Sequence, residues 1–387
     1  MIRVAILGTG AIASTHIEAF LILNTRAEIV ALMDPDLAKT REKIARYHLN
    51  ARAYADVDAL LNDAHFDLGV ICAPPFAHAP LALALLGAGK HVLVEKPMAT
   101  SLAECDAMLA AAREHRRLLS VVAQNRFRTP LVKLKRIVES GRIGKIVHAQ
   151  VDSFWWRGSH YYDLWWRGTW EKEGGGCTLN HAVHQIDLFH WIVGMPQSVQ
   201  AILANLAHDN SEVEDFATAV LFYANGRIGQ INVSLVHHGE PQQLVVQGER
   251  ARVGVPWQVY ASRQRDNGFP ERDSALEQDI QTFYDQLPAL PYELHVGQIA
   301  NVLAALEGTE ELWVDGEAGR RTIELVTAIY AAGFTGARVA LPLPPDHPLY
   351  TREGILKHAP HFHEKTHSIA SFADNTIIVG AASEQRQ

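Results

Sequence analysis

The sequence has few cysteines and no long apolar run, and both absences exclude classes of protein. Its three cysteines, Cys72, Cys105 and Cys177, are odd in number and widely spaced, which excludes a disulfide framework and argues against a zinc ribbon. No apolar run is long enough to span a bilayer. The chain opens on a short apolar stretch, residues 1–7, that leads into a glycine turn rather than a signal peptide. We therefore expect a reduced, cytoplasmic location and no membrane partner.

The sequence also has fewer basic residues than acidic residues. The chain has 35 Lys and Arg residues against 43 Asp and Glu residues, so its formal net charge is -8. Phosphate contacts need an excess of Lys and Arg, and we expect no nucleic-acid partner. A chain of 387 residues is too long for one ordinary hydrophobic core, so the length favours two domains.

The first third of the chain alternates short apolar runs with helical patterns. The helical patterns lie at residues 37–47 and 102–114, and the strand-like runs lie at residues 3–7, 29–33, 68–71, 91–94 and 118–122. Strands that are apolar on both faces suit a parallel sheet covered by helices. This alternation predicts a doubly wound parallel sheet, the Rossmann arrangement, over residues 1–124.

The pattern changes near Asn125. A helix is expected at residues 131–140, a long strand at 146–156, and one continuous apolar helix from about Gly176 to about Val193. Strand-like segments then follow one another at residues 199–206, 216–223, 228–236, 243–246 and 253–260, before helical patterns at 276–287, 298–306 and 319–332. Successive strands predict a large, mostly antiparallel open sheet.

The overall prediction is an α/β fold with a Rossmann domain over 1–124, an α/β substrate and oligomerisation domain over 125–345, and a C-terminal tail over 346–387. The second sheet has too few helices to cover both of its faces. Because an uncovered face tends to bind a partner, we expect a homodimer or homotetramer.

A glycine turn follows the first strand. Gly8-Thr9-Gly10-Ala11-Ile12-Ala13 stands between that strand and a helix, where glycines allow a tight turn and close approach to a diphosphate at the helix N-terminus. Asp34 follows the second strand, where an acid binds the ribose 2′-hydroxyl and repels the 2′-phosphate of NADP. These residues predict NAD rather than NADP. The plain alternative is a tight turn with Asp34 acting as a helix cap.

Lys96 follows the fourth strand, at the sheet edge where ligands bind in open α/β sheets. An ammonium there can stabilise a developing alkoxide or exchange a proton. Pro97 restricts Lys96 to extended backbone geometry. The alternative is a surface lysine in a turn.

The expected helix after Gly176 carries Asn180, His184 and Asp187. On one continuous helix, Asn180 and His184 would share a face. An imidazole suits proton transfer to or from a hydroxyl, and an amide can orient that hydroxyl. His181, His184 and Asp187 could also be read as metal ligands, but no second shell is apparent, so we predict no metal. A packing role for His184 is the other alternative.

Aromatic residues crowd the polar segment between the long strand and this helix. Flat rings suit the C–H faces of a sugar while Arg and Asp take its hydroxyls, and the alternative is an interface or interdomain anchor. From this segment we assign Trp156, Arg157, Tyr162 and Trp166 to the substrate. The tail carries His358, His361, His363 and His367, which we interpret as part of a surface extension that could pack on a neighbouring subunit, rather than as a metal site.

These motifs together resemble the glucose-fructose oxidoreductase/inositol dehydrogenase/rhizopine catabolism (Gfo/Idh/MocA) family. The resemblance covers roughly residues 1–345 and is carried by the glycine turn, Pro74-Pro75 with His78, Glu95-Lys96-Pro97, Asn125-Arg126-Phe127, Gly174-Gly175-Gly176 with Asn180, His184 and Asp187, Ala328-Ile329-Tyr330, and Val339-Ala340-Leu341-Pro342-Leu343. Many members have Asp where this chain has Asn180, so a proton relay through position 180 is not expected.

The resemblance implies a hydride transfer between a nicotinamide and a sugar or polyol carbon, with Lys96 and His184 as catalytic residues. It implies cofactor contacts from Gly8, Thr9, Gly10, Ala11, Ile12, Asp34, Ala73, Pro74, His78, Glu95, Lys96 and Gln124. It implies substrate contacts from Lys96, Asn125, Arg126, Asn180 and His184, beside the four residues of the aromatic segment.

The sequence therefore predicts an NAD-dependent dehydrogenase of a sugar, sugar derivative or cyclitol. Whether Lys96 or His184 is the base stays open. Two alternatives also stay open: NAD-dependent glycoside cleavage, in which transient oxidation permits elimination, and a non-catalytic NAD-sensing regulator on the same fold.

Overall fold

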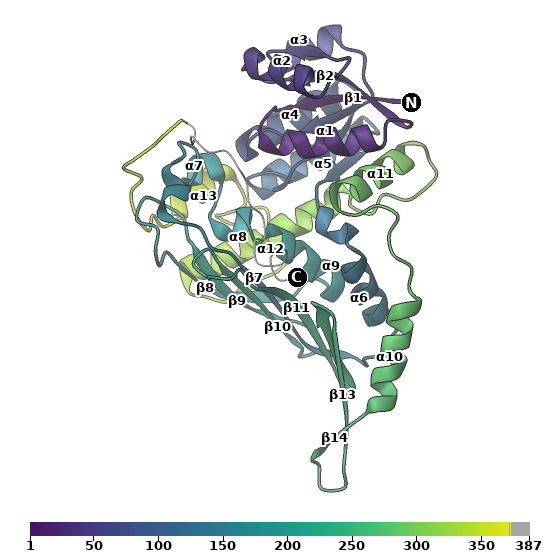
Figure 1. Cartoon of the computed structure of the whole chain (residues 1–387). Coiled ribbons are helices and arrows are strands. Elements are labelled where there is room, and N and C mark those ends of the chain that lie inside the picture. The colour runs from purple at the N-terminus through teal and green to yellow at the C-terminus, as the bar shows by residue number, and fades with distance from the viewer. Residues whose placement is uncertain (371, 373–387) are drawn as a thin grey trace.

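The computed structural model describes residues 1–370 and 372. The N-terminal part is a six-stranded parallel sheet in the order β3-β2-β1-β4-β5-β6, the doubly wound order of a Rossmann domain (Figure 1). Its strands are β1 (Ile2–Leu7), β2 (Ala27–Met33), β3 (Arg52–Tyr54), β4 (Leu68–Ile71), β5 (His91–Val94) and β6 (Leu119–Val121). Its helices are α1 (Ala11–Ile22), α2 (Leu37–Arg46), α3 (Val57–Asp63), α4 (His78–Gly87) and α5 (Leu102–Glu114), with short 3-10 turns η1 (Pro75–Ala77) and η2 (Gln124–Phe127). The predicted parallel sheet is confirmed. The sequence reading missed β3, a three-residue edge strand with no apolar run.

The second part is a nine-stranded sheet in the order β14-β13-β12-β11-β7-β10-β9-β8-β15. Its strands are β7 (Ile146–Phe154), β8 (Ser198–Ala204), β9 (Phe216–Phe222), β10 (Ile228–Ser234), β11 (Gln242–Gly248), β12 (Ala251–Val255), β13 (Gln258–Gln264), β14 (Pro270–Arg272) and β15 (Val339–Ala340). All neighbours are antiparallel except β7 and β10, which confirms the predicted sheet. The single strand expected at 253–260 is wrong, because Pro256 and Trp257 turn the chain and divide it into β12 and β13.

Helices cover one face of this second sheet. They are α6 (Thr129–Glu139), α8 (Cys177–Asn180), α9 (Val183–Val193) and α12 (Gly316–Thr335), while α7 (Trp170–Glu173), α10 (Ser274–Gln286), α11 (Leu294–Leu306), α13 (Arg352–His358) and η3 (Ser159–Asp163) complete the list. On β9, buried residues facing these helices alternate with half-buried residues on the other face, and Figure 1 shows that outer face without helices. The partner that we expect on this face stays a prediction.

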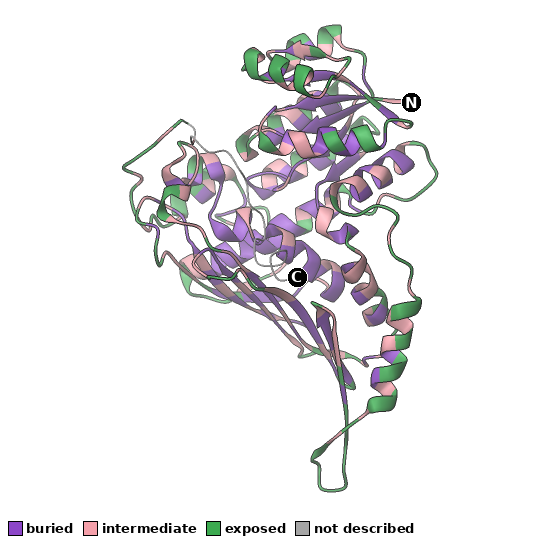
Figure 2. Ribbon diagram, viewed as in Figure 1, coloured by how far each residue is buried: buried purple, intermediate pink, exposed green. Residues whose placement is uncertain are grey.

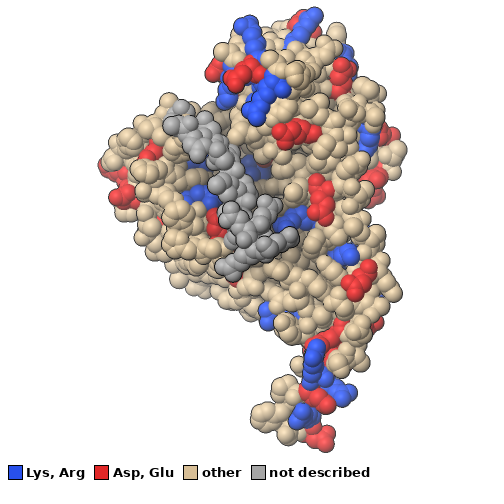
Figure 3. Space-filling model, in the orientation of Figure 1, with Lys and Arg blue, Asp and Glu red and all other residues tan. Residues whose placement is uncertain are grey.

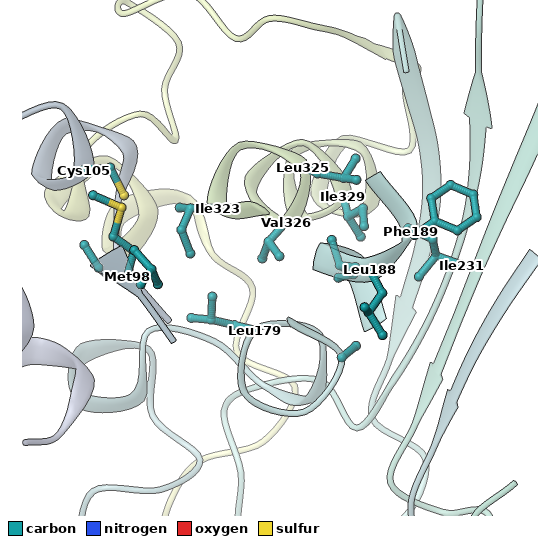
Figure 4. Packing of buried hydrophobic residues seen from close by; sticks show 14 of the residues in the cluster. Met98, Cys105, Leu179, Leu188, Phe189, Ile231, Ile323, Leu325, Val326 and Ile329 are labelled. Atoms are coloured by element: carbon teal, nitrogen blue, oxygen red, sulfur yellow. The ribbon is translucent and has the colours of Figure 1, made fainter. Parts of the chain in front are cut away.

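Two helices near the C-terminal end of the sequence, α11 and α12, pack against the N-terminal part of the molecule. Residues of α11 complete the core cluster between α1 and the first sheet. Helix α12 packs against α5 and β6 of the first part and against α9 and β8 of the second. Figure 4 shows Ile323 and Val326 of α12 between Met98 and Cys105 on one side and Leu188 and Ile231 on the other. The core is therefore continuous across both parts, and the exact division at residues 124 and 345 stays a prediction.

The elements differ in how far they are exposed to solvent, and charged side chains of both signs occur over the surface. Figure 2 shows buried strands in the first sheet and a largely exposed arm formed by α10 and the β13–β14 hairpin. On the face in Figure 3, basic and acidic side chains are interspersed over both parts of the molecule.

The three cysteines are free and buried. Within residues 1–370 and 372, no helix combines the length and the apolar character that a membrane crossing needs.

Candidate functional site

The glycine turn after β1 has the geometry that a diphosphate site needs. Gly8 has a φ of +96°, and a Cβ there would lie 2.6 Å from the carbonyl carbon of Cys72, so a side chain would be strained at this position. Gly10 is the N-cap of α1 and makes no side-chain capping hydrogen bond. A Cβ at Gly10 would meet nothing within 4 Å. The first-turn N–H groups of α1, which include those of Ala11 and Ile12, are therefore left for an anionic ligand.

Asp34 connects the end of β2 to this turn. Its Oδ2 accepts hydrogen bonds from the backbone N–H of Thr9 at 2.8 Å and from the Thr9 hydroxyl at 3.0 Å, and its Oδ1 accepts from the N–H of Asp36 at 3.0 Å. A carboxylate offers about four lone-pair positions. Asp34 therefore holds the turn and keeps acceptor capacity for a ribose diol.

The other predicted cofactor residues lie along the same edge of the first sheet. The His78 ring lies between the carbonyl oxygens of Ala73, at 2.8 Å, and Pro97, at 2.7 Å, while Pro74 caps η1. Gln124 begins η2, and its buried Oε1 has no hydrogen-bond partner among the described residues. An orphaned acceptor of this kind fits a ligand donor. The residues present therefore fit an NAD molecule on this edge.

Lys96 stands where β5 ends, and its ammonium group reaches the second part of the molecule. Its Nζ donates to the backbone carbonyl oxygen of Asn180 at 3.1 Å. Burial lowers the pKa of Lys96 below its usual value, although the negative charge of Glu95 opposes part of that shift. The side chain is half-buried, so the remaining N–H groups can serve a bound oxygen atom.

The continuous helix expected from Gly176 to Val193 is wrong. The chain forms α8, which ends at Asn180, and then α9, which begins at Val183. Because α8 ends there, the carbonyl of Asn180 is free to accept from Lys96. The Asn180 side chain points back, donating to the carbonyl oxygens of Gly175 at 2.7 Å and Gly176 at 3.3 Å. Asn180 and His184 therefore do not share a face of one helix.

His184 lies on α9 beside Lys96. The two residues line one small cavity of about 20 Å³, together with Asp187 and apolar residues from β6 and α12, which is room for about one water molecule. Burial, with the positive charge of Lys96 next to it, lowers the pKa of His184 to about 3. The imidazole is therefore neutral at neutral pH, and it is a weak base that takes a proton only from a strongly acidic donor.

Arg126 and Asp187 form a buried ion pair behind this site. The Nε and Nη2 atoms of Arg126 each donate to Asp187 at 2.7 Å, and Thr322 adds a third hydrogen bond to the same carboxylate at 3.0 Å. Arg126 is 3% exposed. The structure places it in this pair rather than at a surface that a sugar could reach, while its neighbour Asn125 is half-buried. Their assignment to the substrate stays a prediction.

A buried cluster of three titratable residues lies beside Lys96. Glu95 was predicted from the sequence, but the other two members, His16 and His295, were not. His16 Nε2 lies 2.7 Å from Glu95 Oε1, and His295 Nε2 lies 3.9 Å from the same oxygen. The other oxygen of Glu95 accepts from the backbone N–H of Lys96 at 3.1 Å. A signal was present for His16: it is a titratable residue on the apolar, buried side of the first helix.

In this cluster, the charged forms of His16 and Glu95 stabilise each other. Burial alone would lower the pKa of His16, but Cys72 and the Glu95 carboxylate raise it to about 10. Burial would raise the pKa of Glu95, but His16 holds it well below its usual range. His16, Glu95 and His295 have ligand atoms within 4.8 Å of one another, yet the 2.7 Å contact is that of an ion pair. In the described part of the chain, His181, His184 and Asp187 form no comparable cluster.

The aromatic segment, residues 155–170, which we call the aromatic loop, contacts the site through His181. Tyr161 Oη lies 3.2 Å from His181 Nε2 and accepts a hydrogen bond from Arg167 Nη1. Arg157 lies over the rings of Trp155 and Tyr161, and Arg167 lies over those of Tyr161 and Trp166. Guanidinium groups and aromatic rings therefore alternate along this wall.

The predicted substrate residues of the loop have different environments. Trp156 is 45% exposed and stacks on His238, and Arg157 pairs with Glu240 at 2.8 Å. Trp166 is half-buried. Tyr162 is 1% exposed and packs edge-on against Tyr161 and His208, so its place is in the core beneath the wall. Their contact with substrate stays a prediction.

Comparison with known proteins identifies the family. Residues 2–123 match the model described as "Oxidoreductase family, NAD-binding Rossmann fold", and residues 131–254 match the GFO/IDH/MocA C-terminal domain. An uncharacterized oxidoreductase of Schizosaccharomyces pombe is 30% identical over 311 residues, which cover 76% of this chain and 82% of the relative. The chain belongs to the Gfo/Idh/MocA family. It is an NAD-binding oxidoreductase.

Two other members of the Gfo/Idh/MocA family bear on its chemistry. The inositol 2-dehydrogenase of Salmonella typhimurium is 29% identical over 195 residues, which cover 50% of this chain and 54% of the relative. The WlbA dehydrogenase of Bordetella pertussis, solved in complex with NADH and UDP-GlcNAcA, is 31% identical with a TM-score of 0.76. That match covers 89% of this chain and 98% of the solved chain.

Proposed function

We propose that this protein is an NAD-dependent dehydrogenase that oxidises a hydroxyl-bearing carbon of a sugar or sugar derivative, or reduces the corresponding ketone. The observation that carries the proposal is that Lys96 and His184, 88 residues apart in the sequence, line one cavity. A charged donor beside a neutral imidazole can hold a hydroxyl oxygen and take its proton.

The roles of these two side chains follow from their charges. The bound cofactor would supply the hydride acceptor. Lys96, fixed by the carbonyl of Asn180, directs its other N–H groups to the substrate oxygen and stabilises the negative charge that develops there. His184 is neutral above about pH 4 because its pKa is near 3. It accepts a hydrogen bond from the hydroxyl and takes the proton as the hydride leaves the carbon, when the hydroxyl is most acidic. The reverse reaction uses the same groups with the proton returned.

A charged sugar derivative is the substrate class that we favour. The aromatic loop brings Arg157 and Arg167 to the wall beside His181, and the WlbA relative was solved with UDP-GlcNAcA, a nucleotide-linked sugar acid. Guanidinium groups recognise carboxylates and phosphates in preference to neutral hydroxyls.

A substrate screen tests this function. NAD⁺ reduction is followed by absorbance with free sugars, inositols, sugar acids and UDP-GlcNAcA. We expect turnover with at least one sugar or sugar derivative, with the acidic ones favoured. Saturable NADH binding without turnover of any compound in the panel contradicts the proposal and favours a regulator. Release of a leaving group with no net NADH identifies glycoside cleavage instead.

A further inference from the structure

The C-terminal tail contains a segment that is joined to the aromatic loop rather than extending from the surface. We call residues 360–369 the strap. The resemblance to the Gfo/Idh/MocA family ends near residue 345, so nothing in the family motifs accounts for it. Leu349, Tyr350 and Ile355, which precede the strap, are buried in the core and fix its starting point.

Hydrogen bonds join the two ends of the strap to the body of the molecule. At the start, the indole N–H of Trp170 donates to the carbonyl oxygen of Pro360 at 3.0 Å. The N–H of Phe362 donates to the carbonyl oxygen of Glu212 at 3.0 Å. At the far end, a short bridge forms around Ile369, which donates to the carbonyl oxygen of Asp163 at 2.8 Å and accepts from the N–H of Trp165 at 3.0 Å.

The middle of the strap is held by one amide side chain. Asn210 Oδ1 accepts from the N–H groups of Thr366 at 2.9 Å and His367 at 3.0 Å, and its Nδ2 donates to the carbonyl oxygen of His367 at 3.0 Å. The same Nδ2 lies 3.2 Å from Asp163 Oδ1 in the aromatic loop. Asn210 therefore ties strap and loop to each other.

Lys365 connects the strap to the charged part of the loop. Its ammonium donates to the carbonyl oxygen of Tyr162, the residue next to Tyr161. Its charge also acts on the buried carboxylate of Glu173, which accepts from Arg167 at 3.2 Å. Glu173 is therefore paired directly with Arg167, and the Lys365 ammonium acts on it only at longer range. Removing Lys365 would leave Arg167 to neutralise Glu173 alone.

The aromatic loop needs this support. Apart from the 3-10 turn η3 and Trp170, the first residue of α7, it has no helix or strand of its own, so most of its backbone groups must find hydrogen-bond partners elsewhere. The strap supplies hydrogen-bond partners for backbone groups of Tyr162, Asp163 and Trp165. These residues flank Tyr161 and Arg167. Tyr161 contacts His181, the residue after Asn180, and Arg167 donates to Tyr161.

We infer that the strap is a positioning element for the substrate side of the site. Lys365 and the backbone around Ile369 hold the aromatic loop so that Tyr161 and Arg167 face the substrate. In the described residues no hydrogen bond joins the strap to the glycine turn or to Asp34, so we expect it to act on substrate affinity and not on cofactor affinity. The expected effect on substrate affinity rests on the proposed function.

The test compares point variants in the full chain. Lys365→Met removes the ammonium and Lys365→Arg restores a cation. We expect the KM for the best substrate of the screen to rise about tenfold or more in Lys365→Met, with kcat and the NADH Kd within about twofold of the parent. Lys365→Arg recovers most of the loss. An unchanged KM in Lys365→Met, or an equal loss of NADH affinity, overturns the inference.

Two truncated chains extend the test to the whole strap. A chain that ends at Ala359 lacks the strap, and one that ends at Phe372 retains it. Hydrogen–deuterium exchange of peptides covering 159–170 needs no substrate. We expect exchange at least tenfold faster in the shorter chain and in Lys365→Met, and parental exchange in the longer one. Parental exchange in Lys365→Met and in the shorter chain overturns the inference. A parent enzyme that turns over no sugar contradicts only the proposed function.

Discussion

Lys96 Nζ donates to the backbone carbonyl oxygen of Asn180 at 3.1 Å, and this contact joins the end of β5 to the end of α8. It depends on the break between α8 and α9, since a carbonyl inside a continuous helix would be occupied by its own helix. The contact fixes the ammonium group beside His184 without neutralising it.

Replacing Lys96 with Met keeps the stem of the side chain and removes its charge. We expect kcat to fall by roughly 10²-fold or more, because electrostatic and acid–base contributions are each of that order. The NADH Kd should change little. Steady-state kinetics with a fluorescence titration of NADH measures both. The control is Lys145→Met, an exposed lysine, which should retain parental kinetics. Parental turnover in Lys96→Met would place the chemistry elsewhere.

The pH–rate profile reports the charge of His184. Because burial lowers its pKa to about 3, His184 stays neutral, and kcat should not fall between pH 7 and pH 5. On the alkaline side, kcat should fall as Lys96 loses its proton, below the usual lysine value because burial lowers that pKa. The profile is measured from pH 5 to pH 10.

His184→Ala should reduce kcat by roughly 10²-fold across this pH range. The exposed His65 provides the matched control, and His65→Ala should leave both rate and profile unchanged. An acid limb centred near pH 6.5 that disappears in His184→Ala would show that His184 titrates normally and that its environment is not as described.

Asp34 should decide between NAD and NADP. Its carboxylate would repel a 2′-phosphate, so NADH should bind more tightly than NADPH. Asp34→Asn retains an oxygen that can accept from Thr9 and removes the charge. We expect the ratio of NADPH to NADH dissociation constants to fall about tenfold or more in this variant. Tighter binding of NADPH than NADH by the parent, in fluorescence titrations, would reverse the assignment.

The His16–Glu95 pair should make stability depend on pH. The folded-state pKa of His16 is raised to about 10 from an ordinary value of 6.5, so its stabilising contribution is complete below about pH 6.5 and declines as pH rises through 10. His16→Gln removes this contribution. We expect it to cost about 3 kcal/mol at pH 6, since it leaves a buried carboxylate without its partner.

Urea unfolding at pH 6 and pH 10 measures the effect. The stability difference between the parent and His16→Gln should be smaller at pH 10. Common contributions from other alkaline groups cancel in this difference. The same difference at both pH values would mean that His16 is not charged in the folded protein.

The outer face of the second sheet should bind another copy of the chain. On β9, the half-buried side chains of Thr218, Val220 and Phe222 face away from the covering helices. This outer face mixes polar and apolar side chains and has no helix over it in Figure 1, and an uncovered sheet face of this kind is open to a second subunit. We expect a dimer or tetramer by light scattering at micromolar concentration. Val220→Glu should shift the population to smaller species. A monomeric parent would refute this expectation.

Local sequence was sufficient for much of the fold and for the cofactor edge. Five strands of the first sheet are short apolar runs that can be recognised locally. Asp34 lies only 25 residues from its hydrogen-bond partner Thr9 in the glycine turn. Gly8 has to adopt a positive φ against Cys72, and no other residue type does so without strain. Lys96 could be assigned to the site from the sequence because it follows a strand, and ligands bind at the carboxyl ends of strands in such sheets.

Tertiary structure alone decided the rest of the site. His16, Glu95 and His295 come from three distant segments and meet only when α11 packs on α1. The break after Asn180 depends on contacts that periodicity does not encode, and Arg126 is directed to Asp187 rather than outward. The strap's role depends on Lys365, Asn210 and Asp163 meeting across long sequence separations. Such pairings require the folded chain, because a residue's type and neighbours in sequence do not specify which distant group neutralises its charge.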